Sequence, residues 1–199
     1  MAHARQLTLA DVEQAAQILR NGGVIAYPTE TVYGLGCDPR NHEAVARIQQ
    51  LKKRDPGKTA MLLVASSIEQ VEKIAILYGA ARIIAEKYWP GPLTLLLSLR
   101  EDVTLHTGVF AEGGVAVRVS SHPFVRALTN VFDFPIVSTS ANISGEPGGR
   151  SAELIMELFG EALDAIIDVG LLPEQKPSTI ARVHEDGRID ILREGAIRL

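Results

Sequence analysis

The sequence predicts a mixed α/β (α+β) fold: one domain with a twisted β-sheet covered by helices and a concave ligand-binding crevice. Short apolar segments alternate with amphipathic ones along most of the 199 residues, as in proteins whose helices pack on a sheet. The last two apolar segments flank the turn sequence HEDGR, which is typical of an antiparallel hairpin. No linker divides the chain, so residues 1–199 are predicted to form a single domain.

The first predicted helix spans about residues 9–21, where one apolar stripe follows a possible N-cap at Thr8. The apolar segment 24–27 comes next, between a glycine and a proline, and is typical of a buried strand. Residues 27–36, YPTETVYGLG, are therefore predicted to be the loop that leaves the carboxyl end of this strand.

A second helix is predicted over residues 42–54, behind a possible N-cap at Asn41 and ending in a basic cluster. The apolar segment 60–65 predicts a strand. Ser67 then begins a capping-box pattern that opens a helix through about residue 76, and a further helix over 80–88 ends at the sequence WPGP.

The rest of the chain repeats the same two patterns. Short apolar or β-branched segments predict the strands, and amphipathic segments between them predict the helices. The strands lie near residues 93–99, 115–119, 136–139, 165–169, 178–183 and 188–193, and the helices near 122–132 and 151–159.

Composition excludes several classes of protein. A net charge of -4 argues against a protein that grips nucleic acid through a broad basic face. Cys37 is the single cysteine, so no internal disulfide forms, and the histidines show no paired spacing that predicts a metal site. No apolar stretch approaches the roughly 20 residues of a membrane-spanning helix, and the amino terminus lacks a secretory signal, which predicts a cytoplasmic protein.

Several polar segments follow the ends of predicted strands or helices, where loops converge on a crevice in open α/β sheets. The cations Lys52, Arg54, Lys58 and Arg118 in these segments predict an anionic ligand such as a nucleoside triphosphate. Neither a P-loop nor a GxGxxG motif occurs to hold phosphates. The segments are residues 28–36, 52–58, 117–123, 138–145 and 176–179.

Structural interpretations of the same residues remain open. Arg118 lies within an apolar strand, where either a bound carboxylate or an internal acid such as Glu112 would offset the cost of its burial. Residues 28–36 could form a turn with Gly34 and Gly36 at special backbone angles, and Glu30 could cap a neighbouring helix. The basic segment could simply face water at a helix end.

Six segments in order resemble the YrdC-like family of threonylcarbamoyl-AMP synthases, in its short single-domain form, over about residues 12–195. They read YPTETVYGLGCDP, LKKRDPGK, WPGPLTLLL, VAVRVSSHP, PIVSTSANISGEP and KPSTI. The resemblance implies synthesis of L-threonylcarbamoyl-AMP from L-threonine, bicarbonate and ATP, with Mg²⁺ assisting and pyrophosphate released. The product would pass to the machinery that threonylcarbamoylates the adenosine beside the anticodon in tRNA.

The resemblance also implies roles for individual residues. Those implied for L-threonine are Thr31, Arg118, Ser138 and Ser178, with Arg118 taking the carboxylate. Those implied for ATP are Lys52, Arg54, Lys58, Ser140, Asn142 and Arg193, of which Lys52 and Arg54 are the expected catalytic residues. No side chain is assigned to Mg²⁺. The chain departs from the family pattern at Asp55 and at Thr59 and Ala60.

Two alternatives stay open at this point. The same surface could belong to a module that binds tRNA or double-stranded RNA without catalysis, and weak tRNA binding by the enzyme itself is also possible on this basis. A carbamoyl-adenylating enzyme that uses carbamoyl phosphate in place of threonine is the third hypothesis.

Overall fold

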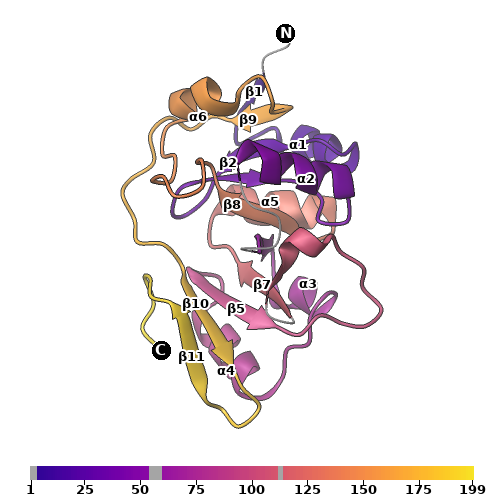
Figure 1. The fold of residues 1–199 in the computed structure, drawn as a ribbon, viewed down its shortest axis with the longest axis vertical. Coiled ribbons are helices and arrows are strands. Elements are labelled where there is room, and N and C mark those ends of the chain that lie inside the picture. Colours follow the sequence, from indigo (N-terminus) through magenta and orange to yellow (C-terminus); the bar gives the residue numbers. More distant parts are fainter. Residues whose placement is uncertain (1–3, 54–59, 112–113) are drawn as a thin grey trace.

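The computed structural model describes residues 4–53, 60–111 and 114–199 (Figure 1). Its strands form one 11-stranded mixed sheet in the order β1-β9-β2-β3-β8-β4-β7-β5-β10-β11, with β6 beside β7. They are β1 (Arg5–Leu7), β2 (Ile25–Pro28), β3 (Tyr33–Gly36), β4 (Leu62–Ala65), β5 (Leu93–Leu97), β6 (Phe110–Ala111), β7 (Gly114–Val119), β8 (Ile136–Ser140), β9 (Ala165–Ile167), β10 (Thr179–Val183) and β11 (Ile189–Arg193).

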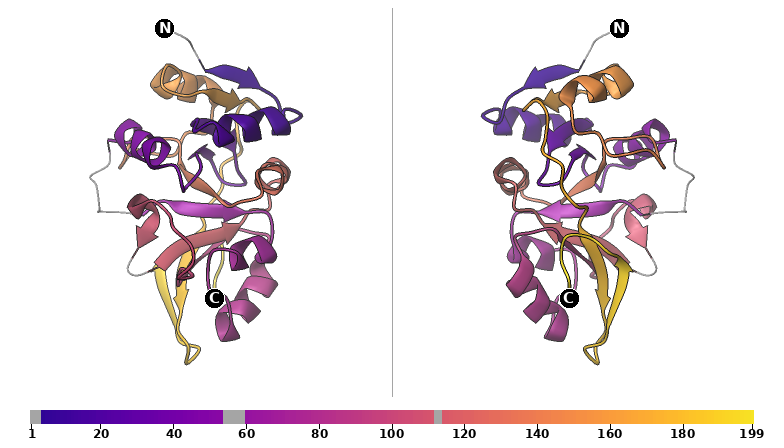
Figure 2. Two further views of the ribbon diagram at one scale, coloured as in Figure 1. Left: turned by 90° about the vertical axis from the view of Figure 1, so that its right-hand side faces the viewer. Right: turned by 90° about the vertical axis from the view of Figure 1, so that its left-hand side faces the viewer.

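Helices lie on both sides of this sheet (Figure 2). They are α1 (Val12–Arg20), α2 (His42–Leu51), α3 (Ile68–Glu72), α4 (Gly79–Tyr88), α5 (Pro123–Phe132) and α6 (Ala152–Phe159), with a short 3₁₀ helix, η1, at Thr107–Val109. One apolar core lies between the sheet and the pair α1 and α5. A larger core collects side chains from α2, α4 and α6 against the rest of the sheet.

The pairing of the strands confirms the predicted mixed sheet. β2 and β9, β4 and β7, and β5 and β10 run parallel, while β3 and β8, β4 and β8, and β5 and β7 run antiparallel. The terminal hairpin β10–β11 is antiparallel, as the HEDGR turn predicts. No helix in the described part of the chain is long and apolar enough to cross a lipid bilayer.

Helix starts follow the predicted caps at two positions and differ at a third. The side chains of Asn41 and Ser67 accept hydrogen bonds from the first turns of α2 and α3, as predicted. α1 instead begins after Asp11, because the amide and hydroxyl of Thr8 both donate to the Asp11 carboxylate at 2.7 Å. Residues 8–10 therefore form a turn, and the N-cap prediction at Thr8 was wrong.

The segment 27–36 is a hairpin rather than the predicted loop. β3 pairs antiparallel with β2, and only residues 29–32 form the connection. Neither Gly34 nor Gly36 has a positive φ, so the interpretation with special backbone angles was wrong. Gly36 has a packing reason instead: a Cβ there would lie 2.5 Å from Cε1 of the Tyr27 ring, which crosses it.

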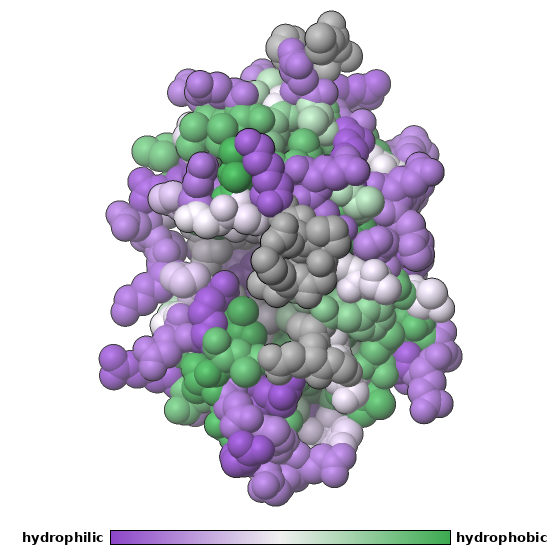
Figure 3. All heavy atoms as spheres, in the orientation of Figure 1, coloured by the Kyte–Doolittle hydropathy of each residue, from purple (hydrophilic) through white to green (hydrophobic). Residues whose placement is uncertain are grey.

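The other differences concern element ends. α2 ends at Leu51, three residues before the predicted helix end, and Lys53 adopts φ 49°, a left-handed angle that interrupts the helix. The short strands β1 and β6 were not predicted, because two or three residues carry too little periodicity. On the face seen in Figure 3, hydrophobic residues gather over α6, where Leu154 and Leu158 are exposed.

Candidate active site

The register of the sheet places Arg118 and Ser138 in one polar row on the same face. Leu62 lies opposite Ser138, and Val64 lies opposite Arg118. Directly paired residues share a face, and side chains alternate along each strand. Val115, Val117 and Val119 therefore enter the larger core, while Arg118 points to the other face.

A cavity of about 730 Å³ covers this row. Such a volume suits a nucleotide-sized ligand, since binding pockets commonly measure about 300–1,000 Å³. Its walls come from β3, β4, β5, β7, β8, β10 and β11 and from the loops between them. The lining includes Thr29, Thr31, Gly34, Leu62, Leu96, Ala116, Arg118, Ser138, Ser140, Asn142, Glu146, Gln175, Ser178, Ile180 and Arg193.

Arg118 is the buried cation of the cavity wall, with 4% of its side chain exposed. Its Nη1 lies 3.1 Å from Oε1 of Glu30, and the Glu30 Oε2 accepts a hydrogen bond from the Ser120 hydroxyl at 2.8 Å. The internal acid is thus Glu30, while Glu112 lies outside the described residues. The alternative in which Glu30 caps a neighbouring helix does not hold, since its carboxylate faces these two side chains.

The Thr29 hydroxyl organises the loop that leads into β3. It donates to the Val32 carbonyl at 2.6 Å and accepts from the amides of Thr31 and Val32. The hydroxyl of Thr31 lies 3.1 Å from that of Thr29. Thr31 also lines the cavity.

Lys52 joins α2 to the segment that follows β8. Its buried ammonium donates to the carbonyls of Ser140 and Asn142 and, at 3.1 Å, to the side-chain oxygen of Asn142. The Asn142 amide group donates to the carbonyls of Ile143 and Glu146. These contacts fix residues 140–142 against the cavity, with the positive charge of Lys52 directly behind them.

Arg193 lies at the rim of the cavity, on the edge strand β11. Its guanidinium donates to the carbonyl and the hydroxyl of Ser178 at 2.8 Å, and the Ser178 hydroxyl also contacts that of Thr94 at 3.0 Å. Partial burial, and then the positive charge of Arg118, lower the pKa of Arg193. Within the described residues no carboxylate pairs with Arg193, so an anion in the cavity would relieve this repulsion.

Close backbone packing holds this rim in place. The amide of Ala196 donates to the Pro177 carbonyl at 2.9 Å. At Gly195 any side chain would collide with the backbone of residues 177–179. The segment after β11 is therefore fastened onto the segment before β10.

The structure brings together most of the residues predicted from sequence. Thr31, Arg118, Ser138, Ser140, Asn142, Ser178 and Arg193 all line the same cavity. Lys52 contacts two of them from behind. Arg54 and Lys58 lie outside the described residues, so their predicted places in the site stay predictions.

Sequence reasoning assigned no role to Thr29, Thr94 or Ser120 and did not pair Glu30 with Arg118. The available signal was local: Glu30 stands between two threonines after a buried strand, and Ser120 follows Arg118 by two residues. Nothing in the sequence reveals that residues 30 and 118 meet, because that contact depends on the sheet order.

Cys37 and His122 play structural parts. Cys37 is fully buried, and this burial raises the pKa of its thiol, so the thiol stays protonated and unreactive. His122 precedes the first residue of α5, and its backbone amide donates to the Ser120 hydroxyl at 3.1 Å. Burial lowers the pKa of His122, and the nearby Glu30 partly opposes that effect.

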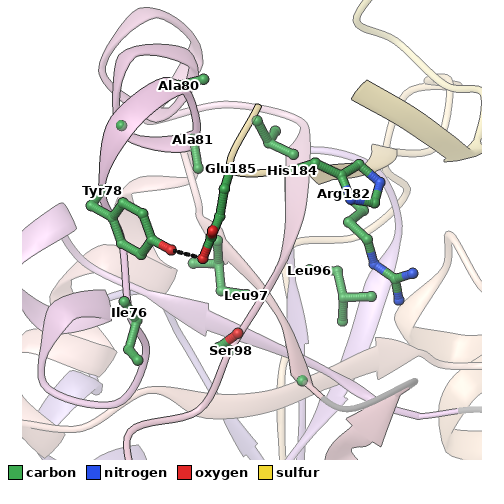
Figure 4. A pocket seen from close by; sticks show the side chains of 13 residues that line it. Ile76, Tyr78, Ala80, Ala81, Leu96, Leu97, Ser98, Arg182, His184 and Glu185 are labelled. Carbon is green, nitrogen blue, oxygen red and sulfur yellow. Dashed lines mark hydrogen bonds between the residues drawn. The ribbon is translucent and has the colours of Figure 1, made fainter. Parts of the chain in front are cut away.

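A second, smaller hollow of about 250 Å³ lies between the β10–β11 hairpin and the start of α4 (Figure 4). Tyr78 and Glu185 point toward one another there, and the tyrosine hydroxyl donates to the carboxylate at 2.6 Å. His184 pairs with Asp190 at 2.6 Å. Among the described residues, none of the predicted site residues lines this hollow.

The arrangement in the larger cavity suits a ligand with several anionic groups. Arg118 and Arg193 supply donors from β7 and β11, and hydroxyls from β8 and from the segment before β10 supply further partners. Charged hydrogen bonds of this kind contribute about 1.5–3 kcal/mol each. The cavity has the geometry to hold a phosphate chain and a carboxylate side by side.

Comparisons with known proteins agree with this geometry. The Sua5/YciO/YrdC family model, described as "Telomere recombination", matches residues 17–195. A threonylcarbamoyl-AMP synthase of Marinobacter nauticus is 42% identical over 184 residues, which cover 90% of this chain and 95% of that protein.

Two solved structures share the fold over nearly the whole chain. The P. abyssi Sua5 protein, complexed with L-threonine, gives a TM-score of 0.84 at 35% identity, covering 98% of this chain. The present chain spans 57% of the length of that protein. E. coli YciO gives a TM-score of 0.84 at 27% identity, covering 98% of this chain and 96% of its own.

Proposed function

This chain belongs to the Sua5/YciO/YrdC family, and from that premise we propose that it is an L-threonylcarbamoyladenylate synthase, a nucleotidyltransferase. The observation that carries the proposal is the cavity in which Thr31, Arg118, Ser138 and Asn142 converge from separate strands and loops. Relatives about 40% identical over most of the chain bear the name threonylcarbamoyl-AMP synthase, which supports the same assignment.

The reaction we propose uses L-threonine, bicarbonate and ATP. The threonine ammonium first loses a proton, and the amine then attacks the bicarbonate carbon to give a carbamate and one water molecule. A carbamate oxygen attacks the α-phosphorus of ATP in line, and pyrophosphate leaves with the electron pair of the broken P–O bond. No protein nucleophile takes part, so the protein contributes positioning and charge stabilisation.

The residues divide between the two substrates in this proposal. The guanidinium of Arg118 takes the α-carboxylate of threonine, and the hydroxyl of Thr31, which lines the cavity, is available to its amine. The hydroxyls of Ser138 and Ser178 lie on the same wall and are available to threonine as further partners.

On the nucleotide side, we assign Ser140, Asn142 and Arg193 to ATP. The contacts of Lys52 indicate that it acts by holding residues 140–142 and by adding positive charge behind them. The family resemblance adds Arg54 and Lys58 to the proposed triphosphate site and gives the catalytic role to Lys52 and Arg54. Mg²⁺ would enter with ATP, held by phosphate oxygens and water.

The product would pass to the enzyme system that modifies tRNA. The alternative, an RNA-binding module without catalysis, gains no support from a net charge of -4. The carbamoyl phosphate alternative is disfavoured by the names of relatives that match most of the chain. Weak tRNA binding and a cytoplasmic location stay predictions of the sequence.

Substrate dependence tests the proposal. Purified protein with Mg²⁺ and ATP should release pyrophosphate and form the threonylcarbamoyl adenylate, detected by mass spectrometry, only when L-threonine and bicarbonate are both present. Arg54→Ala should abolish this release, while Arg20→Ala, a change at an exposed arginine of α1, should leave it unchanged. Pyrophosphate release that ignores threonine would contradict the proposal, and so would a dependence on carbamoyl phosphate.

A further inference from the structure

The buried polar atoms that lack a hydrogen-bond partner gather in one place. Within the described residues they are Nε of Arg118, Nδ1 of His122 and Oε1 of Glu30, whose contact with Nη1 of Arg118 is an ion pair without hydrogen-bond geometry. Ser120 links the three residues, since its hydroxyl donates to Glu30 and accepts from the His122 amide. A buried donor without a partner is costly, which points to a ligand that completes the group.

The position of Glu30 decides which edge of the Arg118 guanidinium can receive that ligand. A guanidinium offers a carboxylate two suitable edges, Nη1 with Nη2 or Nε with Nη2. Oε1 of Glu30 lies 3.1 Å from Nη1, so the carboxylate takes the Nη1 side of the guanidinium. Nε, on the other side, is buried without a hydrogen-bond partner among the described residues, and Arg118 lines the cavity.

The Glu30 carboxylate is itself held by a rigid element. Its Oε2 accepts from Ser120 at 2.8 Å, and the Ser120 hydroxyl accepts from the amide of His122, immediately before α5. Arg118 comes from β7 and Glu30 from the connection between β2 and β3. Two segments distant in sequence, residue 30 and residues 118–122, thus fix the rotation of one guanidinium.

We propose that Glu30, oriented by Ser120, is a positioning residue that turns the Nε and Nη2 edge of Arg118 toward the carboxylate of the amino-acid substrate. This inference rests on the proposed function, because it assumes that an amino acid occupies the cavity. Glu30 does not line the cavity, so it acts through Arg118 rather than on the substrate.

Electrostatics alone predicts the opposite sign for a change at Glu30. Removing a carboxylate beside Arg118 makes the local potential more positive, and an anionic substrate should then bind more tightly. If Glu30 instead orients the guanidinium, its removal should weaken binding. The direction of the change therefore separates positioning from simple charge compensation.

Calorimetric titration with L-threonine and with L-threoninamide, which lacks the carboxylate, tests the proposal. Glu30→Gln should raise the Kd for L-threonine about 10-fold, equivalent to ~1.4 kcal/mol, and change that for L-threoninamide less than about twofold. Glu86→Gln is the matched control, because Glu86 pairs with Arg82 on an exposed face. ATP binding within about twofold of the unchanged protein shows that a variant keeps its cavity.

A double-mutant cycle adds a second, independent readout. Arg118→Lys removes the two-edged guanidinium, so adding Glu30→Gln to it should cause little further loss. If Glu30→Gln fails to fold, Ser120→Ala carries the same test without removing a charge, and should raise the Kd for L-threonine about 3-fold.

Three results would overturn the proposal: unchanged or tighter L-threonine binding in Glu30→Gln, an equal loss for L-threoninamide, or additive effects in the cycle. A protein that binds neither ligand before any substitution would contradict the proposed function instead.

Discussion

The larger cavity and the hollow beside α4 contain similar kinds of side chain but hold them differently. In the cavity, Arg118 and Ser138 are almost fully buried, and Arg118 is held by a chain of contacts that reaches α5. In the hollow of Figure 4, Tyr78 is 54% exposed and donates a hydrogen bond to Glu185 in the exposed turn between β10 and β11. The number of polar side chains therefore does not distinguish a ligand-binding site from an ordinary surface hollow. The burial of those side chains and the contacts that hold them do.

The physical reason is the solvent around each group. Water around exposed groups competes for hydrogen bonds and screens charge, so an exposed pair stabilises a protein by at most about 1 kcal/mol. Buried donors act in a medium of low dielectric constant and need no reorganisation when a ligand arrives. Changes in the cavity should consequently have far larger effects than changes in the hollow.

The largest effect is expected for Arg118→Lys. An ammonium cannot form the two parallel hydrogen bonds that a guanidinium gives to a carboxylate, so threonine-dependent turnover should fall about 100-fold. Pyrophosphate release at varied L-threonine measures this loss. Arg126→Lys, on the exposed side of α5, is the control. Equal losses in both variants would remove the distinction between the two regions.

Lys52→Met should destabilise the protein by about 2–4 kcal/mol, because the oxygen atoms of Ser140 and Asn142 would stay buried without their charged donor. Urea denaturation measures the change in unfolding free energy. Lys53→Met offers an adjacent exposed control, expected to stay within about 0.5 kcal/mol. ATP binding should weaken in the first variant, while a stable variant with full ATP affinity would refute the role given to Lys52.

Thr29→Val should raise the KM for L-threonine about 5-fold, since two loop amides and the Thr31 hydroxyl lose their shared partner. Thr29→Ser keeps the hydroxyl and should restore a KM within about twofold of the original protein. Steady-state kinetics at saturating ATP distinguishes the two. Should both variants behave alike, the hydroxyl does not organise the loop.

The smallest effect is expected in the second hollow. Tyr78→Phe removes the hydrogen bond to Glu185 and should change kcat/KM for either substrate by less than about twofold. Its effect on unfolding free energy should stay below about 1 kcal/mol. A substantial loss of turnover in this variant would show that the hairpin transmits changes to the rim of the cavity.

Much of the fold could be predicted from local patterns, because caps and periodicity act over a few residues. Asn41 and Ser67 were found in this way, and the antiparallel terminal hairpin followed from its turn sequence. β3 was missed, because its glycines suggested a turn, whereas the crossing Tyr27 ring explains Gly36.

For the candidate site, too, the sequence predicted local features but not tertiary contacts. Chemically distinctive segments and the family resemblance identified residues such as Arg118 and Asn142, which do share one cavity. The ion pair between Glu30 and Arg118 depends on how β2 and β7 are placed in the sheet. The hydrogen bond from Lys52 to Asn142 depends on the course of the chain after β8. Contacts of this kind require tertiary structure.

The strand order has a kinetic consequence. β2 lies beside β9, and β5 lies beside β10, so most neighbours in the sheet are far apart along the chain. Chains dominated by such distant pairings reach their native state slowly, since long loops must close first. Residues 29 and 193 share one cavity, so a growing polypeptide on the ribosome cannot acquire ligand affinity until its final hairpin has emerged. Stopped-flow refolding should accordingly show recovery of ligand binding no earlier than recovery of the complete sheet.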